Sequence, residues 1–178
     1  MRVTQSDGML VGGLNAASPV EVFDEYAEST GQSFDKQAPI PFFLHNTLGL
    51  ETPTGHKIRV PLAVHDDGSV SCASDVPAGA TVHIMKTSSE AGVEAASNAT
   101  EAALRQLDGL RPQVALFFDC VATRLRMGGE FGHELEALQQ ALGPTRFVGC
   151  NTYGQIARAD GQFSGFHNCT AVVCIIPE

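Results

Sequence analysis

The stretch ALFFDCVATRLRMGGE, residues 115–130, passes from apolar residues to polar ones and then to a pair of glycines. Its apolar run, residues 114–118, is continuous and of strand length, which predicts a central strand buried on both faces. The ends of such strands often hold functional residues, because the side chains leave the core while the backbone stays rigid. We therefore expect Asp119, Cys120 and Arg124 to contribute to a site at this strand end.

Three segments have the sequence features of helices. Ser18 is a suitable N-cap for residues 19–29, and Glu21 stands three residues later, where it closes a capping box. A thin alanine-rich apolar face predicts a long helix over residues 87–107. Apolar residues at helical spacing predict another helix over residues 130–142.

Short apolar runs bounded by turn residues predict the strands. A hairpin is expected within residues 1–17, and Asp66-Asp67-Gly68 predicts a second one between residues 56–65 and 69–73. Further strands are expected at residues 81–86, 146–150 and 170–176. Glycine and proline break up the segment FFLHNTLGLETPTG, residues 42–55, so we expect it to be packed but irregular.

These elements predict an α/β fold of the mixed α+β kind, in which a mixed β-sheet is layered with about three helices. The C-terminal half is expected to run β-α-β-α-β-β-β. The chain has 178 residues, a length that suits a single domain. Within that domain we expect a leading hairpin at 1–17, a helix, β-hairpin and long helix at 18–110, and a βαβ-hairpin half that carries the motifs at 111–178.

Charge and composition exclude several functions. The formal net charge is −9 and no basic stripe is present, which argues against a nucleic-acid partner. The longest apolar run, AVVCII, is far too short to cross a bilayer, and the N-terminus lacks the apolar region of a secretory signal. The five cysteines form no CxxC pair, which favours free thiols. We expect a cytoplasmic protein without a membrane partner.

The stretch GCNTYGQIARADG, residues 149–161, predicts a loop with ligand-binding side chains. The amides of Asn151 and Gln155 and the hydroxyl of Tyr153 suit the orientation of a small ligand, and Gly154 lets backbone approach it. Turn chemistry by itself also explains the glycines. The residue types favour binding over catalysis, because the loop contains no evident general base.

His167 and Asn168 open the final predicted strand, and they either point into a pocket or satisfy backbone groups at the turn. Cys120 is either a nucleophile with His167 as its base or a small buried residue. Glu130 and His133 share one helical face, but a metal site needs more ligands than these two. The common hydrolase, protease and nucleotide-binding motifs are missing. No catalytic residue and no metal ligand is therefore expected.

Three stretches, FFDCVATRLRMG, FVGCNTYGQIA and GFHNCTAVVCII, resemble the C-terminal domain of the FIST family. Upstream, PFFLHNTLGL, the hairpin KIRVPLAVHDDGSVSCASDVPAGATV and RVTQSDGMLVGGLNAASPVEVFDEYA are also similar to it. The resemblance covers nearly the whole chain. It implies a cytoplasmic sensory domain that binds a small ligand such as an amino acid. Residue by residue, it implies pocket positions at Cys120, Tyr153, Gly154, His167 and Asn168.

The chain departs from the family pattern at two positions. The family usually has glutamate where this chain has Gln155, and its arginine aligns with Thr123, which leaves Arg124 one position late. If that arginine and glutamate pair in relatives, losing both avoids an unpaired buried charge. The family also carries a larger N-terminal domain, so the resemblance implies a FIST N-like domain or a signalling output domain as partner. An interface left exposed without that domain predicts a homodimer.

The leading expectation is thus a non-catalytic sensory module that binds a small ligand and relays the event in signal transduction. Three alternatives stay open. One is a haem-binding gas sensor, because the six histidines and five cysteines include candidate axial ligands and some family members resemble haem sensors. The others are an enzyme that uses Cys120 and a protein-interaction scaffold without a small-molecule site. Apart from that haem alternative, no cofactor is expected.

Overall fold

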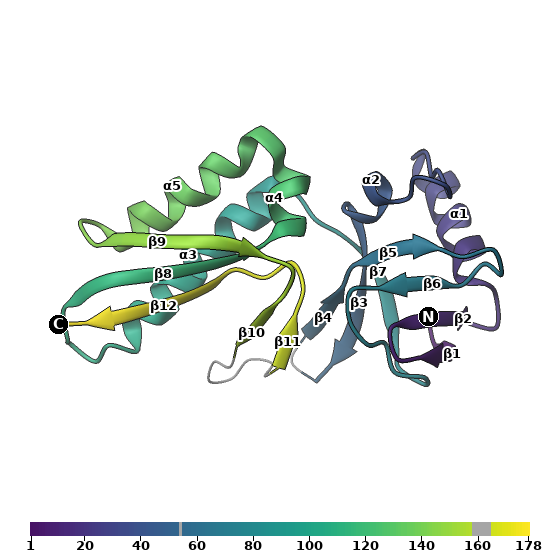
Figure 1. Cartoon of the computed structure of the whole chain (residues 1–178), viewed down its shortest axis with the longest axis horizontal. Coiled ribbons are helices and arrows are strands. Elements are labelled where there is room, and N and C mark those ends of the chain that lie inside the picture. Colours follow the sequence, from purple (N-terminus) through teal and green to yellow (C-terminus); the bar gives the residue numbers. More distant parts are fainter. Residues whose placement is uncertain (54, 158–164) are drawn as a thin grey trace. The chain divides into compact units, whose positions relative to one another are not determined.

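The computed structural model describes residues 1–53, 55–157 and 165–178 (Figure 1). The described chain divides into two compact units. Unit 1 comprises residues 1–86, and unit 2 comprises residues 87–157 and 165–178. The single domain expected from the sequence stays a prediction.

The described residues of unit 1 form two helices and two antiparallel sheets. The helices are α1 (Pro19–Thr30) and α2 (Ile40–Phe43). The first sheet has the order β1-β2-β6-β5, with bounds Val3–Asp7, Leu10–Leu14, Val70–Cys72 and Pro61–Val64. The second has the order β4-β3-β7, with bounds Gly55–Arg59, Asn46–Thr52 and Val82–Lys86.

Helix α1 forms where the capping pattern predicts it. The backbone N–H of Ser18 donates to Glu21 Oε2 at 3.2 Å, and Gly31 ends the helix in the left-handed conformation with φ 66°. Phe23 of α1 has no exposed surface and packs against Phe42 and Phe43, with ring centroids 6.1 and 5.0 Å away. These aromatic contacts lie in the core of unit 1.

The prediction that residues 42–55 form an irregular segment is wrong. Its first residues belong to α2, and most of the remainder forms β3, the central strand of its sheet. Gly49 lies inside the strand, where a Cβ would lie only 2.4 Å from Met85 Cγ on β7. The glycine admits a neighbouring side chain. Pro53 lies in the turn after β3.

Unit 2 contains a three-stranded mixed sheet, three α-helices and a short hairpin among its described residues. The helices are α3 (Ser89–Arg105), α4 (Val121–Met127) and α5 (Phe131–Leu142), with a 3₁₀ turn at Gly128–Glu130. The sheet order is β12-β8-β9, with bounds Val172–Pro177, Pro112–Cys120 and Arg146–Thr152. The hairpin pairs β10 (Gln155–Ala157) with β11 (Gly165–His167). The predicted mixture of helices and mixed sheet is confirmed, whereas α4 was not predicted.

β8 is the central strand, as its apolar run predicts, and it lies between β12 and β9 (Figure 1). It is parallel to β9 through the α4–α5 crossover and antiparallel to β12. The strand predicted before the long helix, β7, pairs with β3 and not with β8. In the described ranges, no helix has the length and apolar character that crossing a bilayer requires.

The two faces of this sheet differ in burial. Ala115 and Phe117 of β8 are buried against Leu138 and Leu142 of α5. Leu116, which points to the opposite face, is only half-buried. The expectation that β8 is buried on both faces is therefore wrong, because α5 packs against one face only. The open face includes Val148, with 60% of its surface exposed, and Ile176, with 42% exposed.

The close pairing of β8 and β9 depends on Gly149. A Cβ at this position would lie 2.0 Å from the Phe117 carbonyl oxygen, a backbone atom that cannot turn aside. We expect Gly149→Ala to lower the free energy of unfolding by about 2 to 3 kcal/mol in urea denaturation, because the strands must separate. The matched control is Gly129→Ala, where a Cβ meets nothing within 4 Å. Equal stability of the two variants would contradict this packing.

Candidate functional site

The helix-covered side of β8 ends in a carboxyl group. Asp119 follows Ala115 and Phe117 at strand spacing, so it points to the same side of the sheet as they do, and it is 1% exposed. On α5, Glu134 stands one turn before Leu138 and is also 1% exposed. The apolar packing between β8 and α5 therefore continues into two buried carboxyl groups.

The two carboxyl groups have raised pKa values. Burial raises the pKa of Asp119 to about 7, with a further increase from Cys120, while a hydrogen bond from the Cys120 N–H and the charge of Arg126 act in the opposite direction. Burial also raises the pKa of Glu134 to about 8, and the charge of Asp119 adds to that increase. At both groups the increase in pKa caused by loss of hydration is larger than the decrease caused by the charge of Arg126.

Residues from several elements surround this pair. We call the set the polar cluster, and it consists of Asp119, Cys120, Thr123, Arg126, Glu134 and Cys169. They come from the end of β8, from α4, from α5 and from the segment between β11 and β12. α4 brings Arg126 to both carboxyl groups because it begins directly after Cys120.

Several polar atoms in and beside the cluster lack hydrogen bonds. Among the described residues, Asp119 Oδ1, Glu134 Oε2, Gln155 Oε1 and Arg126 Nε are buried and have no hydrogen-bond partner. Buried polar atoms in folded proteins are nearly always paired, so such a group is a candidate binding site. Three of the four atoms are oxygens that accept hydrogen bonds and the fourth is a donor.

Some of the residues predicted from the sequence lie beside the cluster. The Asn151 side-chain amide donates to Asp119 Oδ2 at 3.4 Å. Gln155, 4% exposed, donates to Thr152 Oγ1 at 2.7 Å, and that hydroxyl lies 3.5 Å from the Asp119 carbonyl oxygen. His167 pairs with Gln155 across the β10–β11 hairpin. Asn168, also predicted, is 1% exposed and immediately precedes Cys169.

Three predicted residues have other surroundings. Arg124 is exposed, donates to the Gly128 carbonyl at 2.6 Å and lies over the Phe131 ring. Tyr153 is 89% exposed. At Gly154 a Cβ would lie 2.1 Å from Phe166 Cζ, so this glycine makes room for a neighbouring ring. The structure does not bring these three into the polar cluster. Part of the predicted loop, residues 158–161, lies outside the described residues.

Sequence reasoning missed Glu134, Arg126 and Cys169. A signal was present for Glu134, which precedes Leu138 by four residues and therefore shares the buried stripe of its helix. Arg126 belongs to α4, a helix too short to be recognised by periodicity. For Cys169 the sequence offers no signal, because its contact with Cys120 joins segments far apart in the chain.

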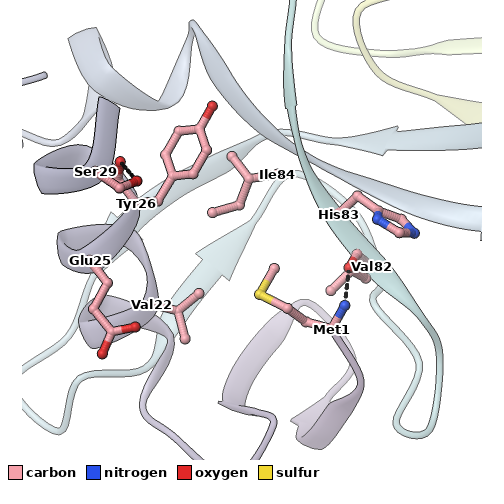
Figure 2. A pocket seen from close by; sticks show the side chains of 8 residues that line it. All are labelled: Met1, Val22, Glu25, Tyr26, Ser29, Val82, His83 and Ile84. Atoms are coloured by element: carbon pink, nitrogen blue, oxygen red, sulfur yellow. Dashed lines mark hydrogen bonds between the residues drawn. The ribbon is translucent and has the colours of Figure 1, made fainter. Parts of the chain in front are cut away.

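A hollow lies on unit 1 between α1 and β7, with a volume of about 500 Å³ (Figure 2). Its lining includes Glu25 and Tyr26 of α1 and His83 of β7. None of the residues predicted for the site lies here. It contains none of the buried atoms without a hydrogen bond, so it has weaker evidence for ligand binding than the polar cluster.

The buried arginine of unit 1, in contrast, has hydrogen-bond partners for its guanidinium group. Arg59 is 4% exposed, its Nε donates to the Asp75 carbonyl at 2.7 Å, and another guanidinium nitrogen donates to the Ile58 carbonyl at 3.0 Å. These contacts account for Arg59 as a structural residue. No group of three or more His, Cys, Asp or Glu side chains is placed to hold a metal ion in the parts of the chain that the structure describes.

The raised carboxyl pKa values make stability depend on pH. Their contribution to the free energy of unfolding is complete below the ordinary pKa values, 3.8 for Asp119 and 4.5 for Glu134, and is lost as pH rises through about 7 and 8. We expect Glu134→Gln to reduce this loss by about 2 to 4 kcal/mol between pH 5 and pH 9, measured by urea unfolding. Glu136→Gln, at an exposed position of the same helix, is the control. A Glu134→Gln profile that parallels the wild type would contradict the buried pair.

Comparison with known proteins identifies the family. The family model described as the FIST C domain matches residues 19–158, a range that runs through parts of both units. No curated protein and no solved structure matches the chain. The match covers well over half of the sequence and agrees with the motifs at the end of β8 and along β9 and β10. The chain therefore belongs to the FIST C domain family.

Proposed function

We propose that this chain is a sensory module that binds a small molecule at the polar cluster of unit 2. FIST domains are a family of sensory domains in signal transduction, and the chain belongs to that family. The observation that carries the proposal is the set of four buried polar atoms without a hydrogen bond, three of which belong to Asp119, Glu134 and Arg126. A ligand that forms hydrogen bonds with these atoms removes the free-energy cost of burying them without partners.

The chemistry of the four atoms indicates the class of ligand. The carboxyl oxygens of Asp119 and Glu134 and the amide oxygen of Gln155 accept hydrogen bonds from an ammonium group. Arg126 Nε donates to a carboxylate. An α-amino acid carries both groups within a few bonds, so it is the ligand that this set of donors and acceptors suits best.

The ligand site is proposed to act by binding and not by catalysis. Binding draws α4, α5 and β8 together around the ligand, and this shifts a conformational equilibrium that an attached domain detects. We further propose that the module works in the cytoplasm, joined to a FIST N-like domain or to a signalling output domain. Haem binding and a reaction at Cys120 are the competing functions, and the screen below includes hemin for that reason.

The proposal predicts stabilisation by a specific amino acid. A thermal-shift screen of amino acids, small carboxylates and hemin should give a concentration-dependent rise in Tm with an amino acid, because a ligand that binds the native state stabilises it. Asp119→Asn should abolish that rise, while the exposed control Glu136→Gln should keep it. Affinity should increase from pH 6 to pH 8, since an ammonium group favours the ionised carboxyls.

Three outcomes of the screen would overturn this proposal. A rise in Tm with hemin alone, together with a protein-bound Soret shift, would establish the haem function in its place. An amino-acid effect that survives Asp119→Asn would move the binding site away from the polar cluster. A lack of any effect from the compounds in the screen would leave the scaffold function as the better account.

The open face of the unit 2 sheet supports the homodimer that we also propose. Val148 of β9 and Ile176 of β12 are exposed large apolar side chains, and Cys150 and Cys174 are exposed on the same strands. A second copy of this chain is the occupant to which we commit, because one apolar face covers an identical one in a two-fold dimer.

Sedimentation velocity over a range of concentrations tests the dimer. We expect the wild type to dimerise and Val148→Lys to shift the equilibrium towards monomer, because a lysine in the interface loses its hydration. Leu62→Lys, at an exposed apolar position of unit 1, is the matched control. A wild type that stays monomeric at high concentration, or equal dimerisation of both variants, would contradict the proposal.

A further inference from the structure

The sheet β4-β3-β7 of unit 1 brings two histidines together across its central strand. His83 on β7 lies opposite Gly49 of β3, and His56 on β4 lies opposite Glu51, two residues further along β3. Opposite residues of antiparallel strands point to the same face of a sheet, and so do residues two apart in one strand. His56, His83 and Glu51 therefore share one face. The two imidazole rings meet there edge to face, with their centroids 5.2 Å apart.

Gly49 leaves the space in which these side chains meet. A Cβ at this position would lie 3.4 Å from the Cβ of His56 and 3.0 Å from the sulfur of Met85. Met85 follows His83 by two residues in β7, so it lies on the same face, and its side chain extends over the glycine. This face therefore carries two imidazoles and a thioether around one position that has no side chain.

The charges on this face suit a cation. Oε2 of Glu51 lies 3.5 Å from Nε2 of His83, and the two side chains are 55% and 47% exposed, so an ion has access to them from solvent. The basic residues of the three strands alternate onto the other face; they are Lys57, Arg59 and Lys86. A cation that approaches this face of the described strands meets a carboxylate and no lysine or arginine.

We propose that His56, His83 and Met85 form a binding site for a copper ion, held as Cu⁺. Metal–imidazole bonds of about 2 Å hold the centroids of two ligating rings about 5 Å apart, close to the 5.2 Å between these two rings. Both histidines are exposed, and exposed side chains turn rapidly between rotamers, so one nitrogen of each ring can face the same ion. The inference does not rest on the proposed function, because this site and the polar cluster share no residue.

The ligand types select the metal. Imidazole binds zinc, copper, iron and nickel alike, whereas a thioether favours Cu⁺. In the described part of the chain, no group of three or more His, Cys, Asp or Glu side chains is placed to hold an ion. The four-ligand set of a structural zinc site is therefore missing. Two imidazoles with one thioether are a ligand set that suits Cu⁺ better than Zn²⁺.

Glu51 is assigned a position beside the ion and not in its ligand set. Its carboxylate accepts a hydrogen bond from Nε2 of His83, and this leaves Nδ1 of that ring to bind the ion. A carboxylate in this position fixes the tautomer of a ligating histidine and makes the ring a stronger ligand. Glu51→Gln is therefore expected to weaken Cu⁺ binding by about tenfold.

A bound ion would connect the two outer strands of the sheet. His56 belongs to β4 and His83 to β7, and these strands lie on opposite sides of β3. The ion would join them without passing through the backbone hydrogen bonds of β3. Binding to the folded sheet should therefore raise the Tm of the protein.

Nuclear magnetic resonance of the full chain, with isotope-labelled histidine and methionine, tests the site. Cys150→Ser and Cys174→Ser are introduced first, because these exposed thiols compete for Cu⁺. Cu⁺ is added under argon with ascorbate, in excess over the protein and its remaining thiols. We expect shifts of the imidazole nitrogens of His56 and His83 and of the Met85 methyl group. The signals of the exposed residues His45 and Met9 should stay unchanged.

Matched variants separate the ligands from the rest of the sheet. His83→Asn should weaken the binding of Cu⁺ by at least about tenfold, because one imidazole ligand is lost. His45→Asn, at an exposed position of the same unit, should leave the affinity unchanged. Met85→Leu keeps the side-chain volume and should weaken Cu⁺ binding but not Zn²⁺ binding, since only Cu⁺ gains from the thioether.

Three results would overturn the proposal. One is the absence of shifts at His56 and His83 while the protein remains folded. Another is a response of the imidazoles without the Met85 methyl group, or tighter binding of Zn²⁺ than of Cu⁺, either of which would remove the assignment of copper. The third is a set of shifts confined to residues next to Cys72, Cys120 and Cys169. The spectra of the protein with intact histidines decide even if a variant fails to fold, and none of these results bears on amino-acid binding by unit 2.

Discussion

The buried face of β8 consists of Ala115 and Phe117, which pack against α5, and it ends in the carboxyl group of Asp119. Glu134, on α5, is the second buried carboxyl group of this contact. An ionised carboxyl loses its hydration at such a place, and the half-buried Arg126 compensates for only part of that loss. The proton therefore becomes a structural component of the cluster near neutral pH. The neighbouring helices complete this cluster, because α4 brings Arg126 and α5 brings Glu134 to the end of β8.

A cluster with unsatisfied polar atoms is poised to respond to its surroundings. Protonation changes the charges of this cluster, and the ligand that we propose would act on the same charges. This property fits membership of a sensory-domain family better than it fits a rigid structural core. Arg59 of unit 1 differs from this cluster, because its guanidinium group is hydrogen-bonded to the carbonyl groups of Asp75 and Ile58.

Much of the fold was predictable from local patterns. Capping residues located α1, an apolar stripe located α5, and the apolar run at residues 114–118 located the central strand β8. One failure came where a glycine has a tertiary role. The sequence predicts that Gly49 interrupts regular structure, but it lies inside β3, where the Met85 side chain on the neighbouring strand leaves no room for a Cβ. No pattern along the chain records that contact.

The sequence by itself determined the family, most of the elements and the strand end at which the candidate site lies, because periodicity, capping and motifs are properties of neighbouring residues. Only the tertiary structure decided which side chains meet there. Glu134 is buried because α5 turns that side to β8, Arg124 faces outward while Arg126 faces the carboxyl groups, and Cys169 meets Cys120 from a distant segment. Burial and electrostatic coupling arise from packing between elements, and a residue's neighbours in sequence do not specify them.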